Sequence, residues 1–292
     1  MIKKGLDFSC KIELRFWRGW VGVFLSLIVV VSWYRSNAIW AEEYPTREQS
    51  KAKAEEVFGV PKNATALSKE GRIWVDKLRK LVIVDGFVTL REGQLEMFAC
   101  PVGSKEHESI VAVFSSSQAV HAGLLAIGAK QGQPTQFEPY KPATGSTIKV
   151  HVLWRDEKNQ KQTQLAQHWI RDVESNKEMP FDWVFAGSIL YKDPDTGEET
   201  YLGDSGDMIC VANFPTATLD IAVKSIAENS ALTYVAFSDR IPPLFTVVRL
   251  VLEVSDQAPK QTNDVKPETK QDTTKQEKEP KKPEQDRSDL FR

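Results

Sequence analysis

Cysteine, methionine and histidine are scarce in this chain, which contains three, four and four of them among 292 residues. Three cysteines are too few for a disulfide-rich scaffold. The sequence has no C-x-x-C-x-x-C run, no P-loop, no glycine-rich dinucleotide fingerprint and no H-E-x-x-H motif, which excludes the standard forms of those cofactor, nucleotide and zinc sites. The net charge is only −2, so no overall positive field points to a nucleic-acid partner.

The sequence also lacks an internal repeat of 20–50 residues, which excludes solenoids and propellers. Hydrophobic residues make up 41% of the chain and charged residues 27%. This is ordinary globular composition, and it excludes collagen, a coiled-coil rod and a fully disordered chain. The length allows two average domains or one large β-rich domain with additions.

Residues 1–41 have the pattern of an export signal or membrane anchor. A basic start precedes residues 19–34, an apolar run without a charge. The length of this run lies between a signal-peptide core and a spanning helix, so cleavage and retention both stay open. Cys10 precedes the run, which argues against a lipid-modified cysteine there. We therefore expect an extracytoplasmic protein, periplasmic or at the cell surface, that contacts the membrane through residues 19–34 if they are retained.

Residues 255–292 are rich in Lys, Glu, Gln, Asp, Thr and Pro, and they contain few large apolar side chains. Such a segment buries too little apolar area to offset its chain entropy. We therefore predict a disordered, hydrophilic tail.

Residues 68–254 are predicted to form one α+β domain, preceded by a helical lead-in over 42–67. Strand patterns outnumber helical ones and follow one another too closely for helical crossovers, which favours a mostly antiparallel sheet with one or two packed helices. A helix is expected over 116–129, capped by Ser116 or Ser117. The expected strands are 73–76, 81–90, 109–114, 147–154, 162–170, 183–191, 208–213, 232–237 and 245–254.

The most unusual stretch is 96–109, which packs a thiol, an imidazole and several carboxylates into one loop between strands. His107 and its charged neighbours have the side chains for acid–base chemistry, although a solvated loop explains them equally. We expect a polar binding loop here, formed by Glu96, Lys105, Glu106, Glu108 and Ser109.

The same stretch is one of five blocks that together resemble the YdjY-domain family of bacterial exported proteins. The other blocks are Ala119-Val-His121-Ala, the turn over 137–145, Trp183-Val-Phe-Ala-Gly187 and residues 209–216. The resemblance covers about residues 68–254 and implies a domain whose activity is unassigned. Some members of that family add a cysteine-rich iron–sulfur module, but this chain lacks the cysteine run that such a module needs.

Cys100, His107, His121 and Cys210 are the candidate ligands for a metal or redox site, since thiolate and imidazole suit zinc and copper. The spacing of Cys100 and His107 matches no standard zinc motif, so no cofactor is predicted. A Cys100–Cys210 disulfide is favoured by an oxidising compartment. Two buried free thiols that pack as small hydrophobic side chains are the third alternative.

Residues 203–207, Gly-Asp-Ser-Gly-Asp, resemble the nucleophile loop of trypsin-like proteases. The residue after Gly206 is Asp207, which would place a carboxylate beside the developing oxyanion, so a hydrolase at Ser205 is disfavoured. Asp204 and Asp207 are candidates for a bound cation. A glycine-rich turn before a strand is the simplest interpretation.

The sequence therefore predicts a non-catalytic envelope protein that binds another protein or a small ligand through the loop around Cys100–Ser109. The alternative is a redox or metal protein built on the two cysteines and two histidines.

Overall fold

The computed structural model describes residues 44–225, 233–259 and 287–291. The part of the chain from Pro45 onward forms one compact unit. The predicted signal or anchor over 1–41 and most of the predicted tail over 255–292 lie outside the described residues. None of the helices within the described ranges is long and apolar enough to span a bilayer.

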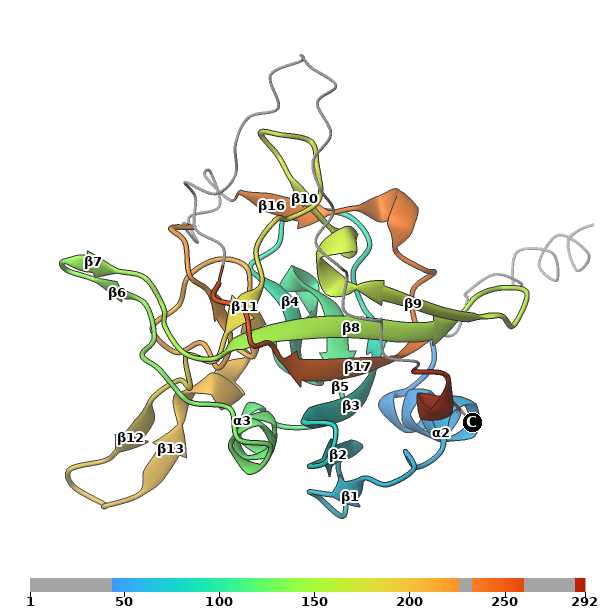
Figure 1. Cartoon of the computed structure of the whole chain (residues 1–292), viewed down its shortest axis with the longest axis horizontal. Helices are drawn as coiled ribbons and strands as arrows, with labels where there is room; N and C mark the ends of the chain where they lie inside the picture. Colours follow the sequence, from blue (N-terminus) through green and yellow to red (C-terminus); the bar gives the residue numbers. More distant parts are fainter. Residues whose placement is uncertain (1–43, 226–232, 260–286, 292) are drawn as a thin grey trace, which may run out of the picture. The chain divides into compact units, whose positions relative to one another are not determined.

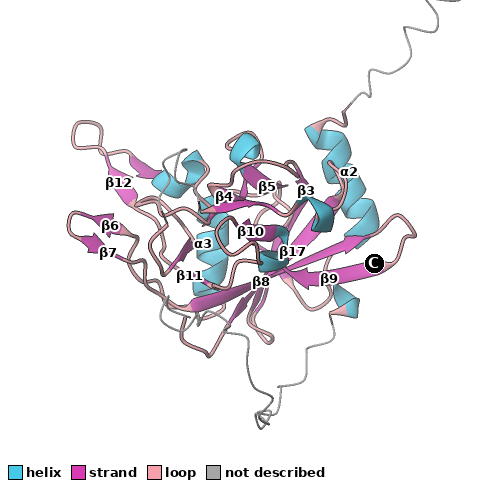
Figure 2. Ribbon diagram, turned by 90° about the horizontal axis from the view of Figure 1, so that it is seen from above, coloured by secondary structure: helices cyan, strands magenta, loops and turns pink. Residues whose placement is uncertain are grey.

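The described chain is mostly sheet with two α-helices, in agreement with the predicted α+β class (Figures 1 and 2). The helices are α2 (Arg47–Phe58) and α3 (Ser117–Ala126). The strands are β1 (Thr65–Ala66), β2 (Ile73–Asp76), β3 (Leu81–Val88), β4 (Met97–Pro101), β5 (Ser109–Val113), β6 (Gln136–Phe137), β7 (Tyr140–Lys141), β8 (Thr147–Arg155), β9 (Lys161–Leu165), β10 (Ile170–Asp172), β11 (Trp183–Val184), β12 (Leu190–Lys192), β13 (Glu199–Tyr201), β14 (Ile209–Cys210), β15 (Asp220–Ile221), β16 (Tyr234–Ala236) and β17 (Val247–Val254).

The main sheet is nearly closed on itself, like a barrel. Its strands follow the order β14-β4-β5-β3-β17-β8-β11-β15. The two ends of this path meet, because the Cys210 N–H donates to the Leu219 carbonyl at 2.9 Å and the Leu219 N–H donates to the Met208 carbonyl at 2.9 Å. Among the described strand pairs, β4 with β5 is parallel and the other pairs are antiparallel.

Both faces of β3 are buried, which explains its continuous apolar sequence. Side chains alternate across a strand. Val82 and Val84 point into the large core inside the sheet, whereas Leu81 and Ile83 belong to a second apolar cluster on the outer face. Helix α2 covers that outer cluster, with Phe58 in it. The hydrophobic effect therefore fixes both the closed sheet and the position of α2.

Helix α2 begins and ends where the sequence signals predict. The Thr46 hydroxyl accepts from the Gln49 N–H, and the Gln49 side chain accepts from the Thr46 N–H, which forms a capping box. Gly59 follows the last turn and Pro61 prevents continuation.

Helix α3 lies against β2 and β3 on the side of the sheet opposite α2. Ser116 is its N-cap, and its hydroxyl accepts from the Ala119 N–H. A Cβ atom at Gly123 would lie 3.0 Å from Leu67 and 3.1 Å from Val82, so the glycine allows the close approach of helix and sheet.

Several of the predicted strands are shorter than expected. The stretch 162–170 keeps β9 and then forms the 3₁₀ turn η2 (Ala166–Trp169) before β10. The stretch 183–191 is divided into β11 and β12, because Gly187 has φ +90° and turns the chain between them. The stretch 208–213 keeps only β14, where the register to β4 shifts between Ile209 and Cys210. Apolar runs alone did not reveal these breaks, since a run has the same apolar composition whether or not it pairs with a neighbouring strand.

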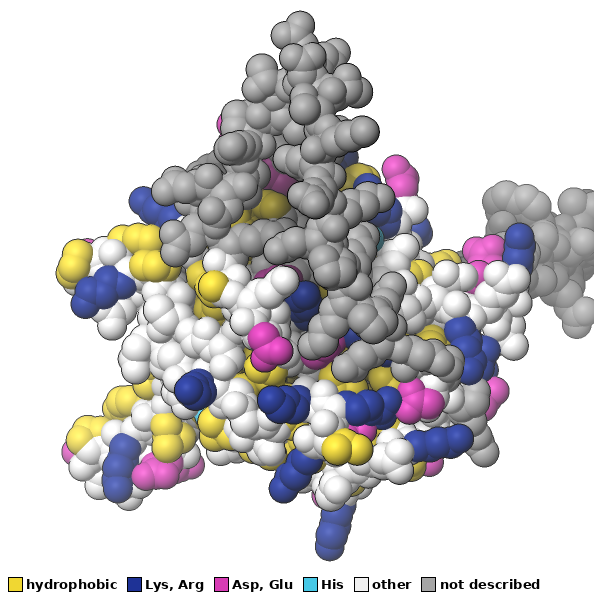
Figure 3. Space-filling view, viewed as in Figure 1, with side chains coloured by type: hydrophobic (Ala, Val, Ile, Leu, Met, Phe, Trp, Pro, Cys, Tyr) yellow, Lys and Arg dark blue, Asp and Glu magenta, His cyan; other side chains and the backbone are white. Residues whose placement is uncertain are grey.

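Two hairpins project from the sheet on one side, β6–β7 and β12–β13 (Figure 1). Hydrophobic side chains gather over them in the space-filling view (Figure 3). Phe137, Leu190 and Tyr191 are 48%, 56% and 46% exposed. The turn of the second hairpin is the predicted one over 193–197, where Asp193 accepts from two backbone N–H groups.

Candidate functional site

The parallel pair β4–β5 creates the most unusual loop of the molecule. Parallel neighbours usually need a dozen or more connecting residues. Here residues 102–108 return the chain to the start of β5, including the 3₁₀ turn η1 (Glu106–Glu108). The loop is held tightly, because Glu106 accepts from the Gly103 N–H at 2.6 Å and the Ser109 hydroxyl donates to the Lys105 carbonyl at 2.8 Å.

Four charged side chains meet beside this loop, and we call Glu96, Lys105, Glu108 and Asp207 the Lys105 cluster. Lys105 Nζ lies 2.9 Å from Asp207 Oδ1 and 4.0 Å from Glu96 Oε2. Glu108 lies beside Glu96, and its carboxyl group contributes to raising the pKa of Glu96. The cluster is half-buried, with 14% of the Glu96 side chain and 30% of the Glu108 side chain exposed.

The backbone around β14 brings Asp207 to Lys105. Gly206 has φ +130°, and a Cβ atom there would lie 2.6 Å from the Lys105 Cγ atom. The glycine therefore provides both the turn and the space for the lysine side chain. The hydroxyl of Thr216 donates to the second oxygen of Asp207, and Lys105 Nζ lies 4.8 Å from the centre of the Phe214 ring.

The environment shifts the pKa values of the cluster. Burial, together with the hydrogen bond and charge of Glu108, raises the pKa of Glu96 to about 7. Burial alone would lower the pKa of Lys105, but its hydrogen bond to Asp207 and the nearby carboxylates raise it. The cluster thus holds an ion pair between Lys105 and Asp207 beside Glu96, whose carboxyl group titrates near neutral pH.

The predicted polar loop is therefore brought together in part. Glu96, Lys105 and Glu108 meet, and Ser109 and Glu106 hold the loop through backbone contacts. Asp207, which the sequence pattern suggested only as a cation ligand, joins them. The sequence indicated residues 209–216 only as a block of the family resemblance, so it did not reveal that Phe214 and Thr216 contact the cluster.

Cys100 and Cys210 are buried free thiols in separate apolar clusters. Cys210 packs with Met97 and Ala217. Burial raises the pKa of both thiols. In this structure the two cysteines pack as small hydrophobic side chains and do not form the disulfide that the sequence left open.

The two candidate histidines lie in different surroundings. His107 is largely exposed, with Nε2 3.3 Å from Glu108. His121 is partly buried on α3, where Nδ1 lies 3.0 Å from the Tyr201 hydroxyl, and burial lowers its pKa. Within the described ranges no three His, Cys, Asp or Glu side chains are grouped so that they could hold a metal ion.

Tyr201 connects His121 to the turn of residues 203–207. Its hydroxyl contacts Thr218 Oγ1 at 3.0 Å and donates to the Gly187 carbonyl at 3.2 Å, and burial raises its pKa to about 12. Asp204, a predicted cation ligand, instead accepts from the Gln118 N–H at the start of α3 at 3.0 Å.

Ser205, the disfavoured nucleophile, belongs to the 3₁₀ turn η3 (Leu202–Ser205). Its hydroxyl donates to the Leu202 carbonyl at 2.7 Å. This hydrogen bond is that of a turn side chain rather than of a serine next to a general base.

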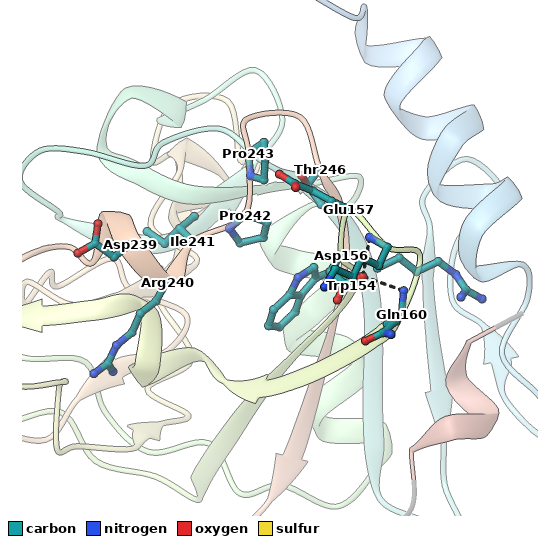
Figure 4. A pocket seen from close by; sticks show the side chains of 12 residues that line it. Trp154, Asp156, Glu157, Gln160, Asp239, Arg240, Ile241, Pro242, Pro243 and Thr246 are labelled. Atoms are coloured by element: carbon teal, nitrogen blue, oxygen red, sulfur yellow. Dashed lines mark hydrogen bonds between the residues drawn. The ribbon is translucent and has the colours of Figure 1, made fainter.

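A cavity of about 480 Å³ lies between the β8–β9 turn and residues 239–246 (Figure 4). Trp154 and Pro242 form its apolar wall. The Asp156 carboxylate is engaged within its own turn, since it accepts from the Lys158 and Gln160 N–H groups at 3.0 and 2.8 Å. The Asp156 carboxylate of this cavity is therefore committed to local turn structure, and we place the candidate site at the Lys105 cluster.

Comparison with known proteins gives one match. The YdjY domain family matches residues 73–253, which agrees with the resemblance expected over about 68–254. No curated protein and no solved structure matches the chain with significance.

Proposed function

This chain belongs to the YdjY-domain family, and from that premise we propose that it is an envelope binding domain that holds a positively charged group of its ligand at the Lys105 cluster. The half-buried Glu96 carboxyl group, which lies 4.0 Å from Lys105 and has its pKa raised to about 7, is the observation that carries the proposal. Half-buried groups with strongly shifted pKa values are concentrated at functional sites.

The chemistry of the cluster favours a cationic ligand group. Lys105 and Thr216 already satisfy Asp207, so its charge is compensated within the protein. The Glu96 carboxyl group lies 4.0 Å from Lys105 and has a raised pKa, so Lys105 compensates its charge only in part. A bound ammonium group takes the place of the Glu96 proton and lies between the Glu96 and Glu108 carboxyl groups. The exposed part of Glu108 gives such a group access from solvent.

Isothermal titration calorimetry with spermidine as the probe tests this proposal. With a pKa of about 7, Glu96 is mostly ionised at pH 8 and mostly protonated at pH 6. Because the proton must leave before the ammonium group binds, we expect affinity about tenfold lower at pH 6 than at pH 8.

Glu96→Gln removes the titrating group, so we expect at least a tenfold loss of affinity at pH 8 and no remaining difference between the two pH values. Glu92→Gln is the matched control, since Glu92 is exposed and outside the cluster. Unchanged spermidine binding by Glu96→Gln would show that the cluster is not the binding site.

We also propose that residues 1–41 direct the domain across the cytoplasmic membrane. The basic start and the apolar run over 19–34 support this. In intact cells treated to permeabilise the outer envelope, added protease should digest the domain. A Val29→Arg, Val30→Arg variant should remain inside and be protected, because charges in the apolar core block insertion. Equal protection of both chains would refute export.

A further inference from the structure

Residues 287–291 return to the domain and lie beside α2 (Figure 1), against the outer apolar cluster, and we call the surface that they cover the groove. Leu290 is fully buried and Phe291 is 7% exposed, and both belong to the outer apolar cluster. The Phe291 ring lies 5.7 Å from the Phe58 ring of α2, measured between centres. These are the two large apolar side chains of an otherwise hydrophilic stretch, and the groove takes up both of them.

A buried charge forms the floor of this groove. Asp85 accepts from Arg249 Nε at 2.6 Å and from Arg72 Nε at 2.8 Å, and all three side chains are nearly or fully buried. Two guanidinium groups against one carboxylate leave donors that need further acceptors. The carbonyl of Gly59 accepts from both arginines, and the carbonyl of Leu290 accepts from Arg249 Nη1 at 2.6 Å.

Two ion pairs of opposite polarity fix the direction of the segment. Arg287 Nη2 lies 2.6 Å from Glu253 Oε2 and 3.0 Å from His151 Nε2. Asp289 Oδ2 lies 2.8 Å from Arg79 Nη1. A segment of reversed direction would exchange these partners and place like charges together.

The aromatic end of the segment has its own recognition. Lys161 Nζ and the Arg155 guanidinium lie 5.1 and 5.7 Å from the centre of the Phe291 ring. Cations near an aromatic face are favourable contacts. Along the segment, the groove therefore contacts a basic side chain, an acidic side chain, a buried backbone carbonyl and an aromatic ring, in that order.

We propose that this groove is a peptide-recognition site, and that the pattern Arg-x-Asp-Leu-Phe at 287–291 is its ligand. The segment binds in cis, where its covalent connection raises its effective concentration, so a modest intrinsic affinity holds it in place. Peptides with the same pattern from outside the chain compete for the groove.

The test uses the full-length chain with Leu290→Ala and Phe291→Ala, which weakens the segment in cis. A fluorescent peptide covering residues 286–292 is titrated and its anisotropy is measured. We expect saturable binding to this variant, and at least tenfold weaker binding to the wild type, whose groove is occupied. Phe137→Ala with Leu190→Ala is the matched control, since it removes the same residue types at exposed positions and should behave as wild type.

Changes in the peptide show whether it uses the same contacts. Alanine in place of Phe291 in the peptide should weaken binding about tenfold or more. Glu253→Gln in the protein and glutamine in place of Arg287 in the peptide should each weaken binding, but the two changes together should cost little more than one, because they remove the same ion pair. If the losses of binding free energy from the two changes were additive, the peptide would bind at a different surface.

A second measurement tests the proposal even if the double alanine variant does not fold. Hydrogen exchange of the wild-type chain should show protection at the Leu290 amide, which donates to the Arg287 carbonyl in the docked segment. Glu253→Gln should reduce that protection severalfold. An unprotected amide in the wild type, or a folded double variant that binds no peptide at millimolar concentration, would overturn the proposal.

Discussion

At the residue scale, buried carboxyl groups are stabilised in two different ways. Asp85 faces two arginines, so its charge is compensated. Asp220 is fully buried among neutral donors: it accepts from Thr135 at 2.9 Å, from Asn213 at 3.0 Å and from the Ile221 N–H at 2.8 Å. Burial raises the pKa of Asp220 to about 7, and the hydrogen bonds oppose that shift only in part.

Asp220→Asn should therefore change the pH dependence of stability. Native Asp220 keeps its proton up to about pH 7, whereas the unfolded chain loses it near 4, so wild-type stability falls as pH rises through this window. Asparagine does not titrate and can keep the same hydrogen-bond partners. The unfolding free energy of the variant relative to wild type should rise by about 2 kcal/mol from pH 5 to pH 7, as measured by urea denaturation.

Asp195→Asn is the control, because Asp195 is exposed in a turn. This substitution should change the unfolding free energy by the same amount at pH 5 and at pH 7. The same difference at pH 5 and pH 7 for Asp220→Asn would mean that Asp220 is ionised throughout.

At the element scale, α3 is positioned by contacts from two places in the sequence. Ser116 caps it locally, and Asp204, far along the chain, accepts from the Gln118 N–H. Negative side chains at a helix N-terminus also interact favourably with the helix dipole. The turn over 203–207 therefore links α3 to the Lys105 cluster, since Gly206 and Asp207 lie two and three residues after Asp204.

Ser116→Ala removes the local cap and should lower the unfolding free energy by about 1 kcal/mol. Thermal or chemical denaturation followed by circular dichroism measures the loss. Ser115→Ala is the matched control and should change stability by less than half as much, because the Ser115 hydroxyl does not cap the helix. Equal losses for the two variants would show that the cap contributes nothing.

At the scale of the whole molecule, closure of the sheet assembles the candidate site. β14 and β15 lie at the two ends of the strand path, and their junction carries Asp207 and Thr216 to Lys105. Trp183 spans this junction inside the core, where its indole N–H donates to the Cys210 carbonyl at 2.8 Å.

Trp183→Phe should lower the unfolding free energy by about 2 kcal/mol, because it removes a buried hydrogen bond and leaves unfilled volume. Guanidinium denaturation measures this loss. Trp154→Phe removes the same atoms from β8, where Trp154 is 7% exposed and lines the cavity of Figure 4, and should cost less. If Trp154→Phe lowered the unfolding free energy more than Trp183→Phe, the hydrogen bond from Trp183 to Cys210 would not be the main contact that closes the sheet.

The long elements could be predicted because their signals are local. The hairpin of β2 and β3, helix α2 with its cap and Pro61, and β8 with β9 all follow from apolar periodicity and turn residues. The short strands β11 and β14 could not, since tertiary packing rather than local pattern decides where a buried apolar run stops pairing.

The candidate site was predictable as a set of residue types but not as an arrangement. The sequence indicated Glu96, Lys105 and Glu108 as one polar loop, and it assigned Asp207 to a different site. Their meeting depends on the unusually short parallel connection over 102–108, which no propensity rule predicts.

The sequence by itself determined the composition class, the mostly antiparallel α+β domain, the family and the pattern of an export segment, because each of these is set by residues close together in the chain. Only the tertiary structure decided that the sheet closes, that Lys105 lies between Glu96 and Asp207, and that residues 287–291 cover Arg249. These features arise from contacts between residues far apart in sequence, whose partners are chosen by burial and charge compensation in the folded state.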